Sequence, residues 1–392
     1  MTKGLCVLGS TGSIGRQCLS VVREARERFH VVALCAGQNL ELLARQARHF
    51  SPKLVVAGAP ELVDPLREQL RQAGVSPSVQ IAAGVSGQVE AATLPEVNTV
   101  VSASHGTTGL VATYKAIQAG KRIGLANKEV MVAAGELATR TAAEHGAEIL
   151  PVDSEHCAIH QCLRSGRHGE VRRLILTASG GPFLKTSRQR LENITPAEAL
   201  LHPTWRMGGR ITIDSASMMN KGLEIIEARW LFGFPSEQIT VLIHPDSIVH
   251  SMVEFRDGSV MAQMSVPDMR LPIQYALDYP DRLAMNSDSK GLDLVAIKKL
   301  RFAAPDARRF PCLELARAAL EAGGPMPCAL NAADEVAVEG FLAGRLRFSD
   351  IPRVIEGVMS ETARLSSLNR LDDVLECDRE ARIRARELVA AL

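Results

Sequence analysis

Short apolar runs alternate with stretches of helical periodicity along the first part of the chain, and this alternation limits the fold more than any other feature. The apolar runs lie at residues 5–8, 31–35, 54–56, 99–101 and 123–125. Short strands that alternate with helices form a parallel sheet with helices packed on its faces. The sequence therefore predicts an α/β fold whose parallel sheet occupies residues 1–150.

Three glycines follow the first apolar run and open the helical stretch behind it. Gly9, Gly12 and Gly15 stand in the segment LCVLGSTGSIG. Glycine lets the backbone approach a pyrophosphate, and the free N–H groups at the positive end of a helix favour its negative charge. The turn predicts a dinucleotide site in a Rossmann-type domain, and an ordinary strand-to-helix turn is the alternative. The donors would come from Thr11, Ser13 and Ile14.

The second apolar run ends in Ala36-Gly37-Gln38-Asn39, a segment without an acidic residue. NAD enzymes carry an Asp or Glu here that binds the ribose 2′-hydroxyl, and that carboxylate would repel a 2′-phosphate. Its absence favours NADP over NAD. Gln38 supplies no positive charge, so a cation for the 2′-phosphate would have to come from a neighbour such as Arg45.

A further strand is predicted at residues 148–152, and Asp153 and Glu155 follow at its carboxyl end. In extended backbone, residues two apart share a face. Ligands of open parallel sheets bind at the carboxyl ends of the strands. Because carboxylate oxygens suit Mg²⁺ or Mn²⁺, the pair predicts a divalent-metal site beside the cofactor.

Two other interpretations of this acidic segment stay open. Asp153 or Ser154 could instead cap a helix over residues 156–163. Two histidines one helical turn apart, with two cysteines nearby, could also bind zinc. These four residues are His156, His160, Cys157 and Cys162. Lone His and Cys side chains on an apolar helix are more often part of a core, and the glutamate of an HExxH motif is absent, so the carboxylates are preferred.

A second polar cluster occurs in residues 211–224, which the pattern predicts as a strand leading into a helix. Asn220 and Glu224 are four residues apart and therefore share a helix face. Ser215, Asn220 and Lys221 could direct polar groups at an anion near the helix start. The cluster predicts a phosphate site beside a metal, and a solvated helix face is the alternative.

Two loops add candidates for the same phosphorylated ligand. Ser179 stands before Gly180 and Gly181, whose exposed N–H groups after a strand would suit an anion. Residues 202–210 contain His202, Trp205 and paired glycines, and such a loop could close over a ligand and exclude water. Placement of Trp205 in a core is the alternative.

The remaining segments predict the domain organisation. Residues 151–285 mix strand and helix signals and are interpreted as an α+β catalytic domain. Residues 286–311 have the proline-containing composition of a linker. Residues 312–392 carry apolar side chains at helical spacing and predict a C-terminal helical domain.

Composition argues against several classes of protein. Lys and Arg number 45 against 44 Asp and Glu, which gives no bulk field for a nucleic acid or an anionic membrane. The eight cysteines contain no CxxC pair and predict reduced thiols in a cytoplasmic protein. We expect neither a signal peptide nor a membrane span.

Long motifs stand far apart along the chain: GSTGSIG, LANKE, PVDSEH, SGGPF, HPTW, DSASMMNKGLE, IHPDSIVHSMV, PDMRLPI and NAADE. In these motifs the chain resembles the 1-deoxy-D-xylulose 5-phosphate reductoisomerase family over essentially its whole length. The resemblance implies a homodimer of V-shaped subunits with Rossmann, catalytic and C-terminal helical domains. It also implies the reaction: rearrangement of 1-deoxy-D-xylulose 5-phosphate, then reduction by NADPH to 2-C-methyl-D-erythritol 4-phosphate, in non-mevalonate isoprenoid biosynthesis.

The resemblance assigns roles to individual residues by their motifs. One Mg²⁺ or Mn²⁺ per subunit would be held by Asp153, Glu155 and Glu224. The substrate would be contacted by Lys128, Ser154, Glu155, Ser179, His202, Trp205, Ser215, Asn220, Lys221 and Glu224. Those with catalytic roles would be Lys128, Asp153, Glu155, His202 and Glu224. The cofactor would be lined by Thr11, Gly12, Ser13, Ile14, Gly37, Gln38, Asn39, Asn127, Glu129 and Gly208.

Four departures from the family pattern accompany the resemblance. Gln38 stands where Lys or a small hydroxyl residue is common, and residues 104–108 replace a more apolar stretch near the cofactor. Arg210 replaces a common Lys, and Asp334 stands where Asn is commoner. Since none touches the expected metal ligands or phosphate contacts, we expect activity with altered cofactor affinity. The alternative functions are a plain NADP-dependent dehydrogenase and a non-oxidative, metal-dependent phosphosugar hydrolase or binder.

Overall fold

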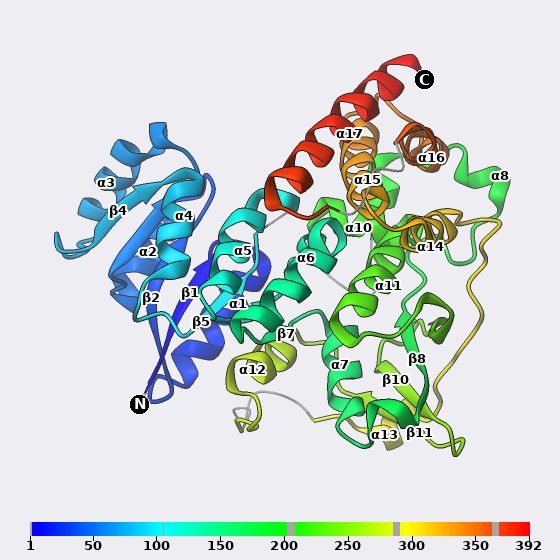
Figure 1. The fold of residues 1–392 in the computed structure, drawn as a ribbon, viewed down its shortest axis with the longest axis horizontal. Coiled ribbons are helices and arrows are strands. Elements are labelled where there is room, and N and C mark those ends of the chain that lie inside the picture. The colour runs from blue at the N-terminus through cyan, green and yellow to red at the C-terminus, as the bar shows by residue number, and fades with distance from the viewer. Residues whose placement is uncertain (1, 105, 202–207, 285–290, 363–367) are drawn as a thin grey trace. The chain divides into compact units, whose positions relative to one another are not determined.

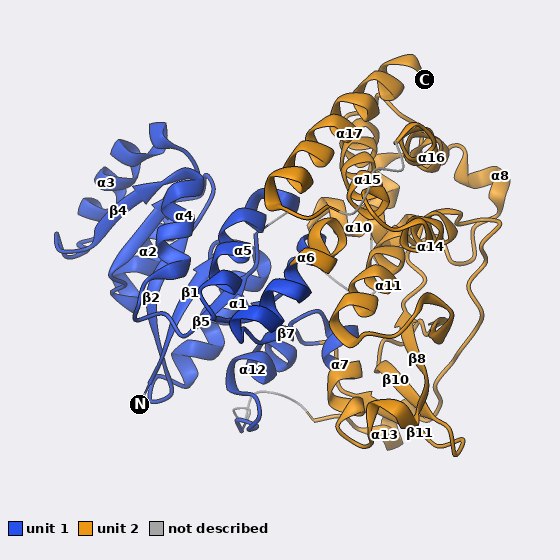
Figure 2. Cartoon of the chain, in the orientation of Figure 1, with its two compact units in different colours: residues 1–130, 138–157, 268–289 blue, residues 131–137, 158–267, 290–392 orange. Residues whose placement is uncertain are grey.

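The computed structural model of the 392-residue chain describes residues 2–104, 106–201, 208–284, 291–362 and 368–392 (Figure 1). By their packing, they divide into two compact units (Figure 2). Unit 1 contains residues 1–130, 138–157 and 268–289, and unit 2 contains residues 131–137, 158–267 and 290–392. The domain bounds expected from the sequence stay a prediction.

A parallel sheet of seven strands forms the centre of unit 1. Its strands are β1 (Lys3–Leu8), β2 (Phe29–Cys35), β3 (Leu54–Ala57), β4 (Gln80–Ala83), β5 (Thr99–Ser102), β6 (Arg122–Leu125) and β7 (Ile149–Pro151). They lie in the order β4-β3-β2-β1-β5-β6-β7, and every neighbouring pair is parallel. The strand order reverses beside β1, so the carboxyl ends of β1 and β5 border the crevice where such sheets bind ligands. The Rossmann-type sheet predicted from the sequence is confirmed.

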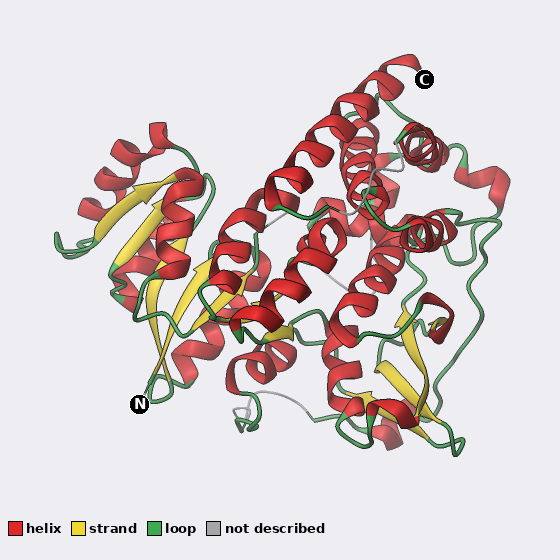
Figure 3. Ribbon diagram, viewed as in Figure 1, coloured by secondary structure: helices red, strands yellow, loops and turns green. Residues whose placement is uncertain are grey.

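Helices pack on this sheet (Figure 3), and several of them contribute apolar side chains to its hydrophobic core. They are α1 (Ser13–Glu24), α2 (Leu40–Phe50), α3 (Val63–Gln72), α4 (Gly84–Thr93), α5 (Leu110–Gln118) and α12 (Arg270–Asp278), with 3₁₀ turns at Pro60–Leu62 and Gly106–Gly109. Helices α6 (Glu129–His145) and α7 (Ser154–Leu163) contain residues of both units. Although α12 is distant in sequence, it contributes Ile273 and Leu277 to the core of unit 1. Its last residue, Asp278, is buried and lies 2.6 Å from Arg28 Nη2 through Oδ1.

Unit 2 contains a mixed sheet with the strand order β11-β10-β8-β9. Its strands are β8 (Val171–Ala178), β9 (Ile239–Ile243), β10 (Val249–Phe255) and β11 (Val260–Met264). β10 is antiparallel to β8 and β11, whereas β8 and β9 are parallel. The β8–β9 pair places two carboxyl ends at one edge of the sheet, and the loop with Ser179 starts there.

The helices of unit 2 share one hydrophobic core with this sheet. They are α8 (Arg188–Leu191), α9 (Pro196–Ala199), α10 (Gly209–Ser217), α11 (Met219–Phe232), α13 (Leu294–Ile297), α14 (Cys312–Ala322), α15 (Met326–Leu342), α16 (Ile351–Glu361) and α17 (Leu371–Ala391). Short 3₁₀ turns lie at His168–Glu170, Ser236–Gln238 and Phe348–Asp350. Helices α11 and α15 are buried over most of their residues, which explains why their sequences are apolar on more than one face. The helical character predicted for the C-terminal part of the chain is confirmed by α14, α15, α16 and α17.

The strand predicted at the start of residues 211–224 is wrong, because these residues lie in helix α10 and the turn into α11. Ile211, Thr212 and Ile213 are β-branched and favour strands by propensity. Tertiary packing overrides that preference: Ile213 is fully buried in the core of unit 2. The Thr212 hydroxyl donates a hydrogen bond of 2.9 Å to the Gly208 carbonyl one turn back, as a helical threonine does.

Within the described residues, we find no helix with the length and apolarity needed to cross a bilayer.

Substitution of Gly15 by Ala is predicted to lower the melting temperature. A Cβ at Gly15 would lie 2.6 Å from the Ser10 backbone, so α1 and the glycine turn would have to separate. Overpacking of this kind costs about 1–3 kcal/mol, which exceeds the gain of about 1 kcal/mol that Ala brings to a helix interior.

Gly169→Ala is the control for this change, because a Cβ there has no neighbour within 4 Å. The melting temperatures of both variants and the wild type, measured by thermal unfolding, test this prediction. Equal melting temperatures for the two variants would contradict the close packing of α1 on the turn.

Candidate functional site

The glycine turn has the geometry of a dinucleotide cradle. Gly9 has a φ of 80°, and a Cβ there would lie 2.7 Å from the Ala103 carbonyl carbon. Gly12 precedes α1 without a side-chain cap, so the N–H groups of the first turn of α1 face the space above β1. Ser13 and Ile14 are the first two residues of that helix. These features fit a pyrophosphate at the start of α1.

A buried polar pair that the sequence did not reveal braces this turn. Ser10 Oγ lies 2.8 Å from Gln46 Oε1, and Gln46 Nε2 donates to the Ser10 carbonyl at 2.9 Å. The backbone N–H of Ser10 also donates to the Cys35 carbonyl at 2.8 Å, which ties the turn to the end of β2. Gln46 looks like any polar residue of an amphipathic helix, so only the fold shows this contact.

The end of β2 presents the segment expected to meet the adenosine ribose. Gly37, Gln38 and Asn39 are exposed, and a Cβ on Gly37 would have no neighbour within 4 Å. Asn39 also caps α2, because its Oδ1 accepts a hydrogen bond from Leu42 N at 3.2 Å. Asn39 is therefore both the cap of α2 and an expected contact of NADP. Arg45 forms an ion pair with Glu41 on the exposed side of α2.

Asn127 follows β6 and carries a buried amide oxygen. Its Nδ2 donates to the Gly106 carbonyl at 2.8 Å and lies 3.4 Å from Ser104 Oγ. Its Oδ1 is buried and has no hydrogen-bond partner among the residues that the structure describes. A buried acceptor of this kind calls for a donor, and a bound ligand can supply one. Ser104 and Gly106 belong to the stretch that departs from the family pattern. Residues of this stretch therefore contact Asn127, which is a predicted cofactor residue.

In unit 1, the acidic residues form a cluster with Lys128 at the end of β7. Lys128 is buried, and its Nζ lies 2.5 Å from Asp153 Oδ2. Asp153 Oδ1 accepts a hydrogen bond from Glu155 N at 3.2 Å, and the Ser154 hydroxyl donates to Glu155 Oε2 at 2.7 Å. The capping interpretation is thus correct for one oxygen of Asp153, since α7 begins at Ser154. The other oxygen, Oδ2, pairs with the Lys128 ammonium group, and the metal-ligand role of Asp153 stays a prediction.

The charge of Asp153 is set by opposing effects. Burial disfavours ionisation, but the positive charge of Lys128 and a hydrogen bond from His156 outweigh it and hold the pKa of Asp153 well below its usual range. Asp153 is therefore a carboxylate at neutral pH although it is enclosed. A buried carboxylate that stays charged is a suitable ligand for a hard cation.

The zinc interpretation of the same segment is not supported. Burial raises the pKa of the Cys162 thiol to about 11 and lowers the pKa of His160 to about 4. Cys157 is a buried free thiol. Among the described residues, neither cysteine belongs to a group of three side chains that could ligate one metal ion. Cys157, His160 and Cys162 therefore fit a core role, whereas the His156 Nδ1 lies 3.5 Å from Asp153 Oδ1.

In unit 2, the junction of α10 and α11 gathers the predicted phosphate residues. Met218 adopts a left-handed conformation with a φ of 64° and separates the two helices. Asn220 Nδ2 donates to Glu224 Oε1 at 2.6 Å, and Lys221 forms a buried ion pair with the same carboxylate. The shared helix face inferred from the spacing is confirmed.

The Ser179 loop lies against the same junction. Gly180 and Gly181 both have positive φ, and a Cβ on Gly181 would lie 2.6 Å from the Ser215 carbonyl oxygen. Only glycine allows so close a backbone approach. The Ser179 loop and Ser215, far apart in sequence, therefore lie against each other near the carboxyl end of α10.

His250 on β10 is a candidate that the motif reading did not single out. It is 5% exposed, and its pKa is lowered by burial, with a smaller contribution from the charge of Lys221. His250 therefore lies near the phosphate residues as a neutral imidazole at neutral pH. Its position within IHPDSIVHSMV was the only signal in the sequence.

The remaining predicted residues have different outcomes. His202 and Trp205 lie outside the described residues. Gly208 is the exposed residue that precedes α10, and Glu129 begins α6. Thr11 lies in the glycine turn, directly before Gly12.

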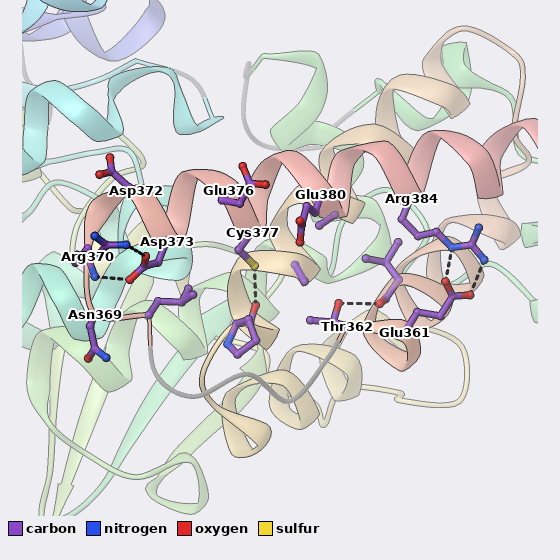
Figure 4. Close-up of a pocket in the computed structure, with 15 residues that line it drawn as sticks. Glu361, Thr362, Asn369, Arg370, Asp372, Asp373, Glu376, Cys377, Glu380 and Arg384 are labelled. Carbon is purple, nitrogen blue, oxygen red and sulfur yellow. Dashed lines mark hydrogen bonds and ion pairs between the residues drawn. The ribbon is translucent and has the colours of Figure 1, made fainter.

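A separate cavity of about 840 Å³ lies along α17 and contains none of the predicted site residues (Figure 4). Its wall includes Glu361, Glu376, Glu380 and Arg384, and Cys377 Sγ lies 3.7 Å from the Pro325 carbonyl. The lining also includes both neighbours of residues 363–367, which the structure does not describe. We therefore assign no ligand to this cavity.

Family models match three consecutive parts of the chain. Residues 5–135 match the model described as 1-deoxy-D-xylulose 5-phosphate reductoisomerase. Residues 149–232 match the model of its C-terminal domain, and residues 264–384 match the model described as DXP reductoisomerase C-terminal domain. The matches cover most of the chain, as expected from the spread of the motifs.

Curated relatives and solved structures are similar over nearly full length. A 1-deoxy-D-xylulose 5-phosphate reductoisomerase of Pelotomaculum thermopropionicum is 53% identical over 97% of both chains, and that of Solibacter usitatus is 50% identical over 98% of this chain and 97% of its own.

A crystal structure of DOX-P reductoisomerase in complex with NADPH, fosmidomycin and magnesium aligns with a TM-score of 0.94 and 40% identity, over 99% of this chain and 98% of that one. The enzyme of Zymomonas mobilis in complex with NADPH aligns with a TM-score of 0.92 and 43% identity over the whole of both chains. Together with the family models, these similarities confirm the resemblance inferred from the motifs: the chain belongs to the 1-deoxy-D-xylulose 5-phosphate reductoisomerase family.

Proposed function

We propose that this chain converts 1-deoxy-D-xylulose 5-phosphate into 2-C-methyl-D-erythritol 4-phosphate with NADPH and a divalent cation, as a step of non-mevalonate isoprenoid biosynthesis. Similarity to members of one enzyme family over the full length of both chains carries the proposal. Solved relatives hold NADPH and magnesium, and both groups fit features of this chain. We also propose a cytoplasmic homodimer with one cation per subunit.

Unit 1 offers a fitting site for NADPH. The cradle at Gly9 and Gly12 suits the pyrophosphate, and the exposed end of β2 has no carboxylate to repel a 2′-phosphate. NADPH supplies a hydride to the aldehyde formed by the rearrangement. We propose that the cofactor is lined by Thr11, Gly12, Ser13, Ile14, Gly37, Gln38, Asn39, Asn127, Glu129 and Gly208. The buried Oδ1 of Asn127 supports this placement, since it can accept a hydrogen bond from the cofactor.

The carboxylate set suits a hard divalent cation. We propose Asp153, Glu155 and Glu224 as its ligands, which follows the family motifs. Bound Mg²⁺ or Mn²⁺ would act as a Lewis acid toward substrate oxygens while the carbon–carbon bond moves. The support in this chain is local: the pKa of Asp153 is held low although its side chain is only 11% exposed, and the Glu224 carboxylate is buried and partnered by cationic and amide groups.

Residues of the chain then orient the substrate. We propose that Ser179, Ser215, Asn220 and Lys221 hold the phosphate, because the Ser179 loop packs on Ser215 near the end of α10, directly before the start of α11. Lys128 supplies a positive charge beside Asp153, where it can stabilise an oxyanion of the substrate. Ser154, His202 and Trp205 are proposed as further substrate contacts from their motifs.

Glu224→Gln is predicted to abolish metal-supported turnover. Loss of a charged ligand weakens metal binding. Even substitution of a residue that only hydrogen-bonds to a metal ligand lowers metal affinity or activity by roughly 10–100-fold, so we expect kcat to fall by on the order of 100-fold. NADPH oxidation with 1-deoxy-D-xylulose 5-phosphate, followed optically with and without chelator, measures this. Glu227→Gln, the same change at a buried position one turn further along α11, is the control.

Three outcomes of that assay would contradict the proposal. Oxidation that is indifferent to chelator would indicate a plain dehydrogenase. Release of inorganic phosphate without NADPH oxidation would indicate a hydrolase. Full activity of Glu224→Gln would remove this residue from the metal site.

Gln38→Glu is predicted to shift the preference from NADPH toward NADH. The wild type should prefer NADPH because the end of β2 carries no acidic side chain. A new carboxylate would repel the 2′-phosphate, so the KM for NADPH should rise by about tenfold while the KM for NADH changes little. Equal efficiency of the wild type with both cofactors would refute the NADP assignment and leave the rest of the chemistry open.

A further inference from the structure

Arg210, near the start of α10, is held by a buried cluster of polar side chains on α10 and α15. Its Nη1 lies 2.8 Å from Glu335 Oε1, and its Nη2 donates to Asn331 Oδ1 at 3.1 Å. Asp214 Oδ2 lies 3.5 Å from Nε, and Asp334 Oδ2 lies 3.5 Å from Nη2. We call these five residues the α10 clasp.

The clasp fixes the two helices against each other. Helices α10 and α15 pack together within unit 2 (Figure 1). Asn331 and Asp334 are fully buried, and Asp214 is 3% exposed, so a shift of α10 would leave these polar groups without partners in the core. Such a loss is costly, because a buried charge or amide needs its hydrogen-bond or ion-pair partner. The planar guanidinium of Arg210 adds directionality that an ammonium group lacks.

A second arginine anchors the far side of the clasp. Arg382 on α17 lies 2.7 Å from Glu335 Oε2 through Nη2 and 2.7 Å from Asp378 Oδ2 through Nε. Glu335 therefore links α17 to α15 and α10. Among the described residues, Arg382 forms no hydrogen bond or ion pair with α10, so it offers a matched arginine for comparison with Arg210.

Helix α10 carries a residue of the proposed substrate site at its other end. Ser215 directly follows Asp214, and the backbone oxygen of Ser215 meets Gly181 of the Ser179 loop. Whatever sets the position of Asp214 along α10 also sets the position of Ser215. The clasp residue Asp214 is thus the immediate neighbour in the chain of the proposed phosphate contact.

We infer that Arg210 is a positioning residue for the substrate phosphate, and that it acts through the clasp to place Ser215. This inference rests on the proposed function, which assigns Ser215 to the phosphate. Arg210 itself touches neither substrate nor cofactor in this account. Its loss therefore weakens substrate binding and leaves the chemical step intact.

Asp334 makes the clasp sensitive to pH. Burial raises the pKa of Asp334 to about 6 against the opposing charge of Arg210, and the negative charge of Glu335 adds to the rise. Asp214 of α10 can share a hydrogen bond with Asp334, and the Cys312 thiol of α14 also faces the two carboxyl groups. Below pH 6 Asp334 is neutral and holds Arg210 less strongly. Above pH 6 it is charged and strengthens the hold on Arg210.

Ionisation of Asp334 strengthens its attraction to Arg210 but lowers the stability of the folded chain. A folded-state pKa above the ordinary value means that the folded chain binds the proton more tightly than the unfolded chain does. The folded state therefore loses stability as the pH rises from the ordinary pKa of an Asp side chain through about 6. Asp334→Asn should remove this loss, so the melting temperature of the variant, relative to that of the wild type, should be higher at pH 8 than at pH 5.

The first test compares Arg210→Lys with Arg382→Lys in steady-state kinetics. We expect Arg210→Lys to raise the KM for 1-deoxy-D-xylulose 5-phosphate by about fivefold or more with kcat within about twofold, and Arg382→Lys to change both by less than about twofold. A fall in kcat at unchanged KM overturns the inference. So does an equal change in the two variants.

The second test uses Asp334→Asn and varies the pH. The ratio of its KM to that of the wild type should be near 1 at pH 5.5 and rise to about threefold at pH 8, because only the wild type gains the charge. Using a ratio cancels the titration of the substrate phosphate. Asp350→Asn is the control, since Asp350 is a buried carboxylate with two arginine partners away from α10. A flat ratio for Asp334→Asn overturns the pH dependence.

Hydrogen exchange of the backbone amides of residues 209–217 tests the clasp without any activity measurement. Exchange should be faster in Arg210→Lys than in the wild type and unchanged in Asp350→Asn. Equal exchange in Arg210→Lys and wild type overturns the inference even if the enzyme is active. A wild type that is inactive with every metal overturns the proposed function instead, whatever the exchange shows.

Discussion

Charged side chains inside a protein must meet opposite charges or hydrogen bonds, and this constraint governs each polar cluster of the molecule. Lys128 meets Asp153 at the end of the parallel sheet, and Lys221 meets Glu224 on α11. Each pair places a carboxylate beside an ammonium group away from bulk solvent, where the field of a charge is strong. The same constraint makes α10 a fixed element, because Arg210 cannot move without stranding buried partners on α15.

The glycines supply the complementary constraint, which is close approach of backbone to backbone. Gly9 and Gly15 allow the turn after β1 to fold tightly under α1, and Gly181 allows the Ser179 loop to lie on Ser215. In both units, a glycine-containing loop after a strand packs closely against neighbouring backbone: the turn itself under α1 in unit 1, and residues 215–216 of α10 in unit 2. Close backbone packing of this kind accompanies both the proposed pyrophosphate site and the proposed substrate-phosphate site.

Much of the fold could be predicted from the sequence, because the strands of unit 1 are short, apolar and separated by helical periods. The shared face of Asn220 and Glu224 also followed from spacing alone. Three features could not be predicted: the helix at Ile213, the brace of Ser10 by Gln46, and the clasp that joins Arg210 to Asp334. Each depends on contacts between segments distant in sequence, where local propensity carries no information. Two of the four noted departures, Arg210 and Asp334, turned out to contact each other.

The central claim is that Asp153, together with Glu155 and Glu224, holds a divalent cation. Electron paramagnetic resonance of Mn²⁺ titrated into the protein tests it most directly, because free and bound ions give different signals. We predict one bound Mn²⁺ per chain in the wild type and an affinity at least about tenfold weaker in Asp153→Asn, with the melting temperature retained. Unchanged Mn²⁺ affinity in a folded Asp153→Asn variant would contradict the account.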